Sequence, residues 1–207
     1  MKPDALNFEH LVDAIAKVHG ALAAQAAKAV NISLTLRNWL IGYYIREYEQ
    51  SGADRSAYGE RLLETLAHRL RQTGFQRVEA RELRRFRQFY LSYPQIRETL
   101  SARLPGIRIR ETPPPESTGS AVPVQSLLER LSFSHFVELV QLDDAPQRAF
   151  YEAEALRGNW SVRELKRQIA TQYYQRSALS TDKAALSKHA HAGAEQVEAG
   201  LALSWGF

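Results

Sequence analysis

The sequence contains no cysteine, which excludes disulfide bonds and thiolate metal sites. No apolar run approaches the roughly 20 residues that a membrane-spanning helix requires, so no membrane partner is expected. The six histidines lack the spacing of a zinc motif, and no glycine-rich phosphate loop or G-x-S-x-G nucleophile motif is present. We therefore predict no catalytic residue, metal site or cofactor, and we expect a reducing, cytoplasmic location.

The composition that is present is typical of a folded protein. The 207 residues can form one ordinary domain or two small ones, and 44% hydrophobic and 24% charged content lie in the globular range. Positive charge is unevenly distributed, because the segment from Arg61 to Arg110 holds 12 arginines against four glutamates in a chain of net charge +4. Guanidinium groups suit phosphates and guanine edges, so this surplus favours a polyanionic partner over a merely solvated helix surface.

Helical spacing of apolar residues predicts an all-α, multi-helix fold without β-strands. Apolar positions at this spacing run from Asn7 to Tyr48, and spacing alone leaves open whether they form one helix or two broken near Asn31. Gly42, beside two large aromatic residues, predicts a point of close packing between helices. Further helices are predicted over about residues 58–72, 81–93, 146–156 and 161–176, with Gly74 as a left-handed cap after the first and Asp144 as the cap of the third. Helical periodicity also resumes at Ser126, and Ser134 is predicted to restart a helix after a bend at Leu131-Ser132-Phe133.

A proline-rich central loop interrupts this helical pattern. The segment from Leu104 to Gln125 contains Pro105, the triple proline Pro113 to Pro115, Gly119 and Pro123, so no helix can persist there, and the predicted connection around it spans residues 101–125. We predict a helical domain over residues 1–180, with lobes at about 7–100 and 126–177 joined by a flexible connection. Residues 181–207 have weak periodicity and are predicted to form a tail.

Two stretches share one layout of an apolar-striped helix, a turn with glycine and a large aromatic, and a basic helix. The first turn is Thr73-Gly74-Phe75 and the second is Gly158-Asn159-Trp160. In the second stretch, Ser161 and Glu164 are spaced as a capping box that starts the basic helix. Because helix-turn-helix proteins place such a second helix in a DNA groove, the layout predicts nucleic acid, in particular DNA, as the partner.

The basic helices supply the candidate DNA-binding residues. Outward positions are predicted for Arg81, Arg84, Arg85 and Gln88 in the first helix, and for Arg163, Lys166 and Arg167 in the second. Arg87 lies nearer the apolar stripe and is predicted to pair with a carboxylate or carbonyl inside the protein. Glu164-Leu165-Lys166 matches the E-x-K tripeptide of many nucleases, but that site requires a strand, whereas this tripeptide follows a helix cap.

Several segments resemble the N-terminal domain of YhcG-type bacterial proteins. They are Ala29-Val30-Asn31, Trp39 to Ile45, Tyr58-Gly59, Gly74-Phe75, Arg87 to Tyr90 with Tyr93-Pro94, Leu131 to Phe136, Arg148 to Tyr151 and Gly158 to Ile169. The resemblance covers roughly residues 8 to 180. It implies an all-helical domain that precedes a nuclease domain of the PD-(D/E)XK class and binds or positions DNA.

Two departures from the family pattern bear on function. The chain is expected to stop near the start of the nuclease domain, so no enzymatic activity is predicted for it. Residues 76–80 lengthen the connection into the first basic helix. The alternative hypothesis is a helical dimerisation or protein–protein interaction module, in which the helices from Phe8 to Tyr48 pack against a second copy and the basic helices only maintain solubility.

Overall fold

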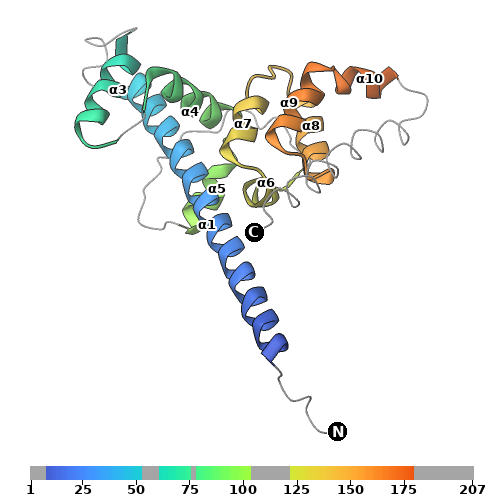
Figure 1. Ribbon diagram of the computed structural model, residues 1–207. Coiled ribbons are helices and arrows are strands. Elements are labelled where there is room, and N and C mark those ends of the chain that lie inside the picture. The colour runs from blue at the N-terminus through green and yellow to red at the C-terminus, as the bar shows by residue number, and fades with distance from the viewer. Residues whose placement is uncertain (1–7, 53–60, 76–77, 104–121, 180–207) are drawn as a thin grey trace.

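The fold is all-α in a computed structural model that describes residues 8–52, 61–75, 78–103 and 122–179, where no strand is present (Figure 1). The helices are α1 (Phe8–Ser51), α3 (Leu62–Gln72), α4 (Ala80–Ser92), α5 (Ile96–Arg103), α6 (Val124–Arg130), α7 (Phe133–Leu139), α8 (Ala145–Arg157), α9 (Val162–Ala170) and α10 (Tyr173–Leu179). Most of the predicted proline-rich loop and the whole predicted tail from residue 181 lie outside these ranges.

Helix α1 is one continuous helix of 44 residues, which settles the question of a break near Asn31. Residues 8–30, here called the arm, are exposed along their whole length, and Figure 1 shows the arm extending alone from the other helices. The alanine-rich stretch from Ala21 to Ala29 has high helix propensity, which favours continuation of the helix without tertiary support. The other described helices, together with α1 from Asn31 onward, are called the body.

Within the body, α1 crosses α4 at a point of backbone contact. A Cβ atom on Gly42 would lie 2.0 Å from the carbonyl oxygen of Phe86, so only glycine permits this approach. Around the crossing, Trp39 and Tyr43 of α1 pack edge-on against Tyr90 of α4. The predicted close-packing role of Gly42 is therefore confirmed.

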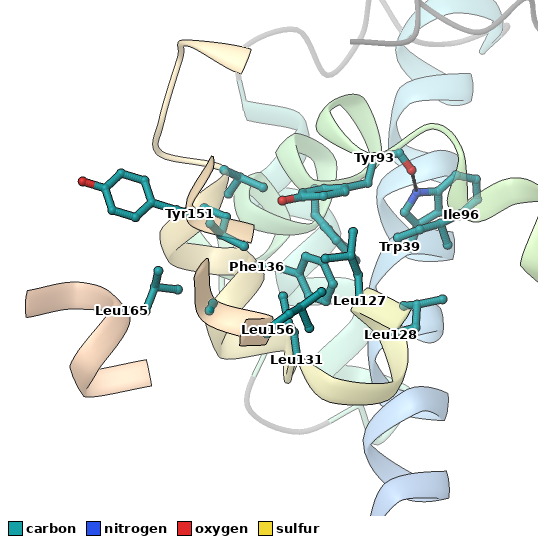
Figure 2. Close-up of a cluster of buried hydrophobic side chains, with 14 of the residues drawn as sticks. Trp39, Tyr93, Ile96, Leu127, Leu128, Leu131, Phe136, Tyr151, Leu156 and Leu165 are labelled. Atoms are coloured by element: carbon teal, nitrogen blue, oxygen red, sulfur yellow. Dashed lines mark hydrogen bonds between the residues drawn. The ribbon is translucent and has the colours of Figure 1, made fainter. Parts of the chain in front are cut away.

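Tyr93, directly after α4, joins three parts of the body. The Trp39 Nε1–H donates a hydrogen bond to the Tyr93 carbonyl at 2.8 Å, as Figure 2 shows, and the Tyr93 hydroxyl donates to Glu152 Oε1 of α8 at 2.8 Å. Burial raises the pKa of Tyr93 well above its usual value, and the neighbouring Glu152 acts in the same direction. The hydroxyl therefore stays protonated and remains a donor to the buried carboxylate.

A single hydrophobic cluster includes residues from both sides of segment 104–121, which lies outside the described residues. It extends from Ile32 and Trp39 of α1 through Phe136 of α7 to Leu165 of α9 and Tyr173 of α10. Figure 2 shows Leu127, Leu131 and Phe136 lying between Trp39 and Leu156. The two predicted lobes thus pack against each other through this cluster.

Local signals placed most helix ends correctly. Asp144 accepts a hydrogen bond from the Gln147 backbone at the start of α8, as predicted, and Gly74 ends the α3 turn with φ +87°. Two predictions were wrong. Helix α7 begins at Phe133, capped by Ser132, rather than at Ser134. The predicted helix over 161–176 is interrupted by Gln172 at φ 54°, which separates α9 from α10.

None of the described helices combines the length and the apolar character needed to cross a membrane.

The Gly42 contact leads to a testable prediction for stability. Gly42→Ala is expected to lower the free energy of unfolding by about 1–3 kcal/mol, because the new methyl group displaces the backbone of α4. Urea unfolding followed by circular dichroism measures this change. Gly20→Ala on the arm is the matched control, since no atom lies within 4 Å of its Cβ position, and it should leave stability unchanged or slightly raised. Equal stability of Gly42→Ala and the parent would contradict the close approach.

His135 predicts a pH dependence of stability. Its Nδ1 accepts a hydrogen bond from the Ser132 backbone N–H at 3.1 Å, so Nε2 carries the proton and donates to the Trp160 carbonyl at 3.0 Å. Burial lowers the pKa of His135 below its usual 6.5, and the hydrogen bond to Trp160 only partly opposes this. Because folding favours the neutral ring, its stabilising contribution is complete above the unfolded-state pKa of about 6.5 and is lost as pH falls below it.

We expect the free energy of unfolding to decrease between pH 8 and pH 5.5, with this residue contributing at most about 1.4 kcal/mol per pH unit. Denaturant unfolding at several pH values gives the slope. His135→Gln should flatten it, whereas His68→Gln, at an exposed position of α3, should not. An unchanged slope in His135→Gln would refute the assignment.

Candidate nucleic-acid interface

Helix α4 presents the first group of candidate residues. Its buried stripe of Leu83, Phe86 and Phe89 packs into the body, and this orientation turns the arginine positions outward. Arg81 and Arg84 are exposed, with 69% and 55% of their side-chain surface accessible, and Gln88 is exposed beside Ser92. Arg85 is only partly exposed, at 38%. The helix therefore carries a basic outer face, as its spacing predicted.

Each of the three arginines on this face has a glutamate neighbour. Arg84 Nη2 lies 2.6 Å from Glu64 Oε1 of α3, and both Arg81 and Arg85 lie 3.5 Å from Glu82 Oε1. The glutamates are themselves accessible, at 51% for Glu64 and 26% for Glu82. Ion pairs in contact with water contribute about 0–1 kcal/mol each, so these arginines can exchange a carboxylate for a phosphate at low cost.

Helix α9 presents the second group, in a different arrangement. Arg163 is exposed and has no ion pair with any described residue, while Lys166 Nζ lies 3.3 Å from Glu138 Oε1 of α7. Arg167 Nη2 contacts Oε1 of the buried Glu164 at 2.8 Å. Gln168 Nε2 donates to the same oxygen at 2.7 Å. Arg167 therefore balances a buried negative charge, which is a structural role.

This arrangement corrects the predicted capping box at α9. Ser161 Oγ does accept a hydrogen bond from the Glu164 backbone N–H at 3.2 Å, so the serine cap is confirmed. The Glu164 carboxylate is directed instead at Arg167 and Gln168 along the helix. The E-x-K tripeptide consequently lies on a helix with its carboxylate already hydrogen-bonded, and no group of carboxylates and histidines suited to a metal ion occurs among the described residues.

The two basic helices belong to one body but are not adjacent. Helix α7 packs against α4 on one side and against α9 on the other, as Figure 1 also shows. The candidate residues are therefore brought together as two groups separated by α7, rather than as one continuous cluster.

Arg87 behaves as predicted, because its guanidinium pairs with Glu49 near the end of α1. The basic residues that sequence reasoning omitted are Arg69 and Arg71 on α3 and Arg61 directly before it, all of which are exposed. Helix α3 packs beside α4, so these residues widen the basic region around the first group. The arginine surplus from Arg61 to Arg110 was the available signal, although it did not indicate which of these side chains would be outward.

An apolar groove of about 500 Å³ lies beside this region, between α1 and α3. Tyr44, Tyr48, Leu66 and Phe75 contribute to its walls, and Arg69 is its one charged residue among those described. The Arg37 guanidinium lies 5.4 Å from the centroid of the Phe75 ring, a cation–π distance. Besides Arg69, the polar groups among its described lining residues are the hydroxyls of Tyr44, Tyr48 and Thr65.

Comparison with known proteins identifies relatives of the whole helical region. The DUF1016 N-terminal domain matches residues 14–113 and 116–176. The "Putative nuclease YhcG" of Escherichia coli (strain K12) is 36% identical over 195 residues, which cover 91% of this chain and 51% of that protein. The chain thus spans about half the length of this curated relative. No solved structure matches. The all-α architecture and the matched residues agree with the family expected from the sequence, and the chain belongs to the DUF1016 N-terminal domain family.

Proposed function

We propose that this chain is a DNA-binding and positioning module of a nuclease-type protein, with α4 as its principal contact surface. The observation that carries the proposal is the outward face of α4, where Arg81, Arg84 and Arg85 are held only by accessible glutamates. The helix fixes the spacing of these arginines, and the planar guanidinium group loses less conformational freedom per hydrogen bond to a phosphate than a lysine ammonium does.

The weakness of the α4 ion pairs distinguishes this helix from α9. Transfer of Arg84 from Glu64 to a phosphate leaves Glu64 in water, because that carboxylate is 51% exposed. Transfer of Arg167 would leave Glu164 buried with only 6% of its side chain accessible, which costs several kcal/mol. We therefore assign DNA contact within α9 first to Arg163, and not to Arg167. Lys166 is an intermediate case, because its partner Glu138 keeps 15% of its side chain accessible and its release costs more than that of the α4 arginines.

The relationship to a protein named as a putative nuclease supports nucleic acid as the partner. That relative is about twice as long as the aligned region, so its activity as a whole can depend on residues beyond the alignment. In this proposal, the helical module supplies affinity and orientation, while cleavage belongs to a separate part of the nuclease-type protein.

The proposal predicts salt-dependent binding to DNA. If Arg81, Arg84, Arg85, Arg163, Lys166 and one further cation contact phosphates, the slope of log affinity against log salt is about −5. The triple variant Arg81→Ala, Arg84→Ala, Arg85→Ala should make this slope shallower by about 2.7. Fluorescence anisotropy with a labelled duplex across a salt series measures both quantities, and single-stranded and branched DNA identify the preferred structure.

The matched control removes three exposed cations elsewhere, with Lys17→Ala, Lys28→Ala and Arg130→Ala on the arm and α6. It changes net charge equally but should alter the slope by less than about one unit. The pair Arg163→Ala and Lys166→Ala measures the share of α9. Equal losses in the α4 variant and the control, or no binding at low salt, would disprove the proposal.

The assignment of cleavage to another part of the protein has its own test. Because the Glu164 carboxylate is buried and already accepts from Gln168, we expect no cleavage of duplex or single-stranded DNA by this chain with Mg²⁺ or Mn²⁺. Gel analysis of supercoiled plasmid provides a sensitive measurement. Metal-dependent nicking that survives further purification and is lost in Glu164→Gln would contradict it.

A further inference from the structure

The arm of α1 carries an apolar stripe that no described residue covers. Six large side chains on one face remain 40–75% accessible: Phe8, Leu11, Val12, Ile15, Val18 and Leu22. At 100° per residue, they fall within about 60° of the direction of Ile15. An exposed apolar face of this length on an isolated helix indicates an interaction surface.

The charged residues of the arm lie on its other side. By the same helical step, Glu9, Asp13, Lys17 and Lys28 are all more than about 90° from Ile15. Lys28 Nζ lies 3.1 Å from Glu129 Oε2 of α6, so the charged side turns toward the body. The stripe consequently faces away from the body, and a partner can cover it without burying any of these four charges.

We infer that the stripe binds a second copy of this chain, with the two arms antiparallel and Ile15 at the twofold axis. A twofold interface requires a surface that complements itself. Most of the stripe meets this requirement, since Phe8 opposes Leu22 and Val12 opposes Val18, so that both members of these pairs are apolar. Leu11 opposes His19, which by the same helical step lies about 40° from Ile15, at the edge of the stripe. Ile15 opposes its own counterpart. This inference does not rest on DNA binding.

The area of the stripe is sufficient for a specific dimer. The accessibilities of its six side chains, from 40% for Leu11 to 75% for Phe8, correspond to on the order of 600 Å² of apolar surface per copy. Complete coverage of both stripes would bury up to about 1,200 Å², which is where stable specific interfaces begin.

The antiparallel arrangement follows from the continuity of α1. Ser33, Arg37 and Tyr44 continue the direction of the stripe into the body and are all exposed. A parallel pair would bring Arg37 of each copy together and place both bodies at one end, where like charges repel. In an antiparallel pair, Phe8 of each arm lies beside Leu22 of the other copy, and the two bodies lie at opposite ends of the paired arms.

Sedimentation velocity of the intact chain over a concentration series tests the inference. We expect a dimer whose dissociation constant rises at least about tenfold in Ile15→Glu, because two carboxylates then face each other at the axis. Ala24→Glu adds the same charge to the opposite, exposed face of the arm and should leave the dimer intact. Urea unfolding confirms that both variants keep the body folded.

Disulfide cross-linking tests whether the two arms are antiparallel. Because the chain has no native cysteine, each introduced thiol is unique. Ile15→Cys should cross-link with itself, and a mixture of Phe8→Cys with Leu22→Cys should form the mixed dimer. Phe8→Cys alone should not. A monomer at all concentrations, equal effects of Ile15→Glu and Ala24→Glu, or an efficient Phe8–Phe8 cross-link would overturn the inference. The DNA affinity of the monomeric Ile15→Glu variant is measured separately, so that failure of the dimer inference can be distinguished from failure of the DNA-binding proposal.

Discussion

The backbone contact between Gly42 and Phe86 is the constraint on which the arrangement of the body depends. A Cβ atom at Gly42 has no room, so α1 and α4 touch main chain to main chain. That proximity brings Trp39 within hydrogen-bonding distance of the Tyr93 carbonyl, and Tyr93 in turn reaches Glu152 on α8. With the inner face of α4 held in this way, Arg81, Arg84 and Arg85 are directed outward.

Arginine serves two opposite purposes in this protein, and the accessibility of its partner decides which. Arg87 and Arg167 pair with the partly buried Glu49 and the buried Glu164, so their guanidinium groups balance carboxylates that the fold removes from water. Arg84 pairs with a carboxylate that is half exposed. Water already stabilises that carboxylate, and this is why the arginine is available to another anion.

Features that depend on neighbours in the sequence were predictable. The caps at Asp144 and Ser161, the left-handed Gly74 and the internal role of Arg87 all follow from spacing within a few residues. Contacts between distant residues were not. Tyr93 and Glu152 are 59 positions apart, and nothing in their local sequence indicates that they meet. The same applies to Lys166 with Glu138, and to the direction of the Glu164 carboxylate, which depends on how α9 is buried.

The continuity of α1 also fixes a relation between its two ends. From Ile15 to Gly42 the helix makes about seven and a half turns, so the arm's apolar face and the α4 crossing lie on opposite sides of one rod. In the antiparallel pair, each α4 would then face away from the neighbouring copy. Such a dimer would present the arginines of its two α4 helices in opposite directions and would therefore bind two separate duplexes rather than one. Insertion of a single residue into α1 between the arm and the α4 crossing would rotate each α4 by about 100° relative to the arm.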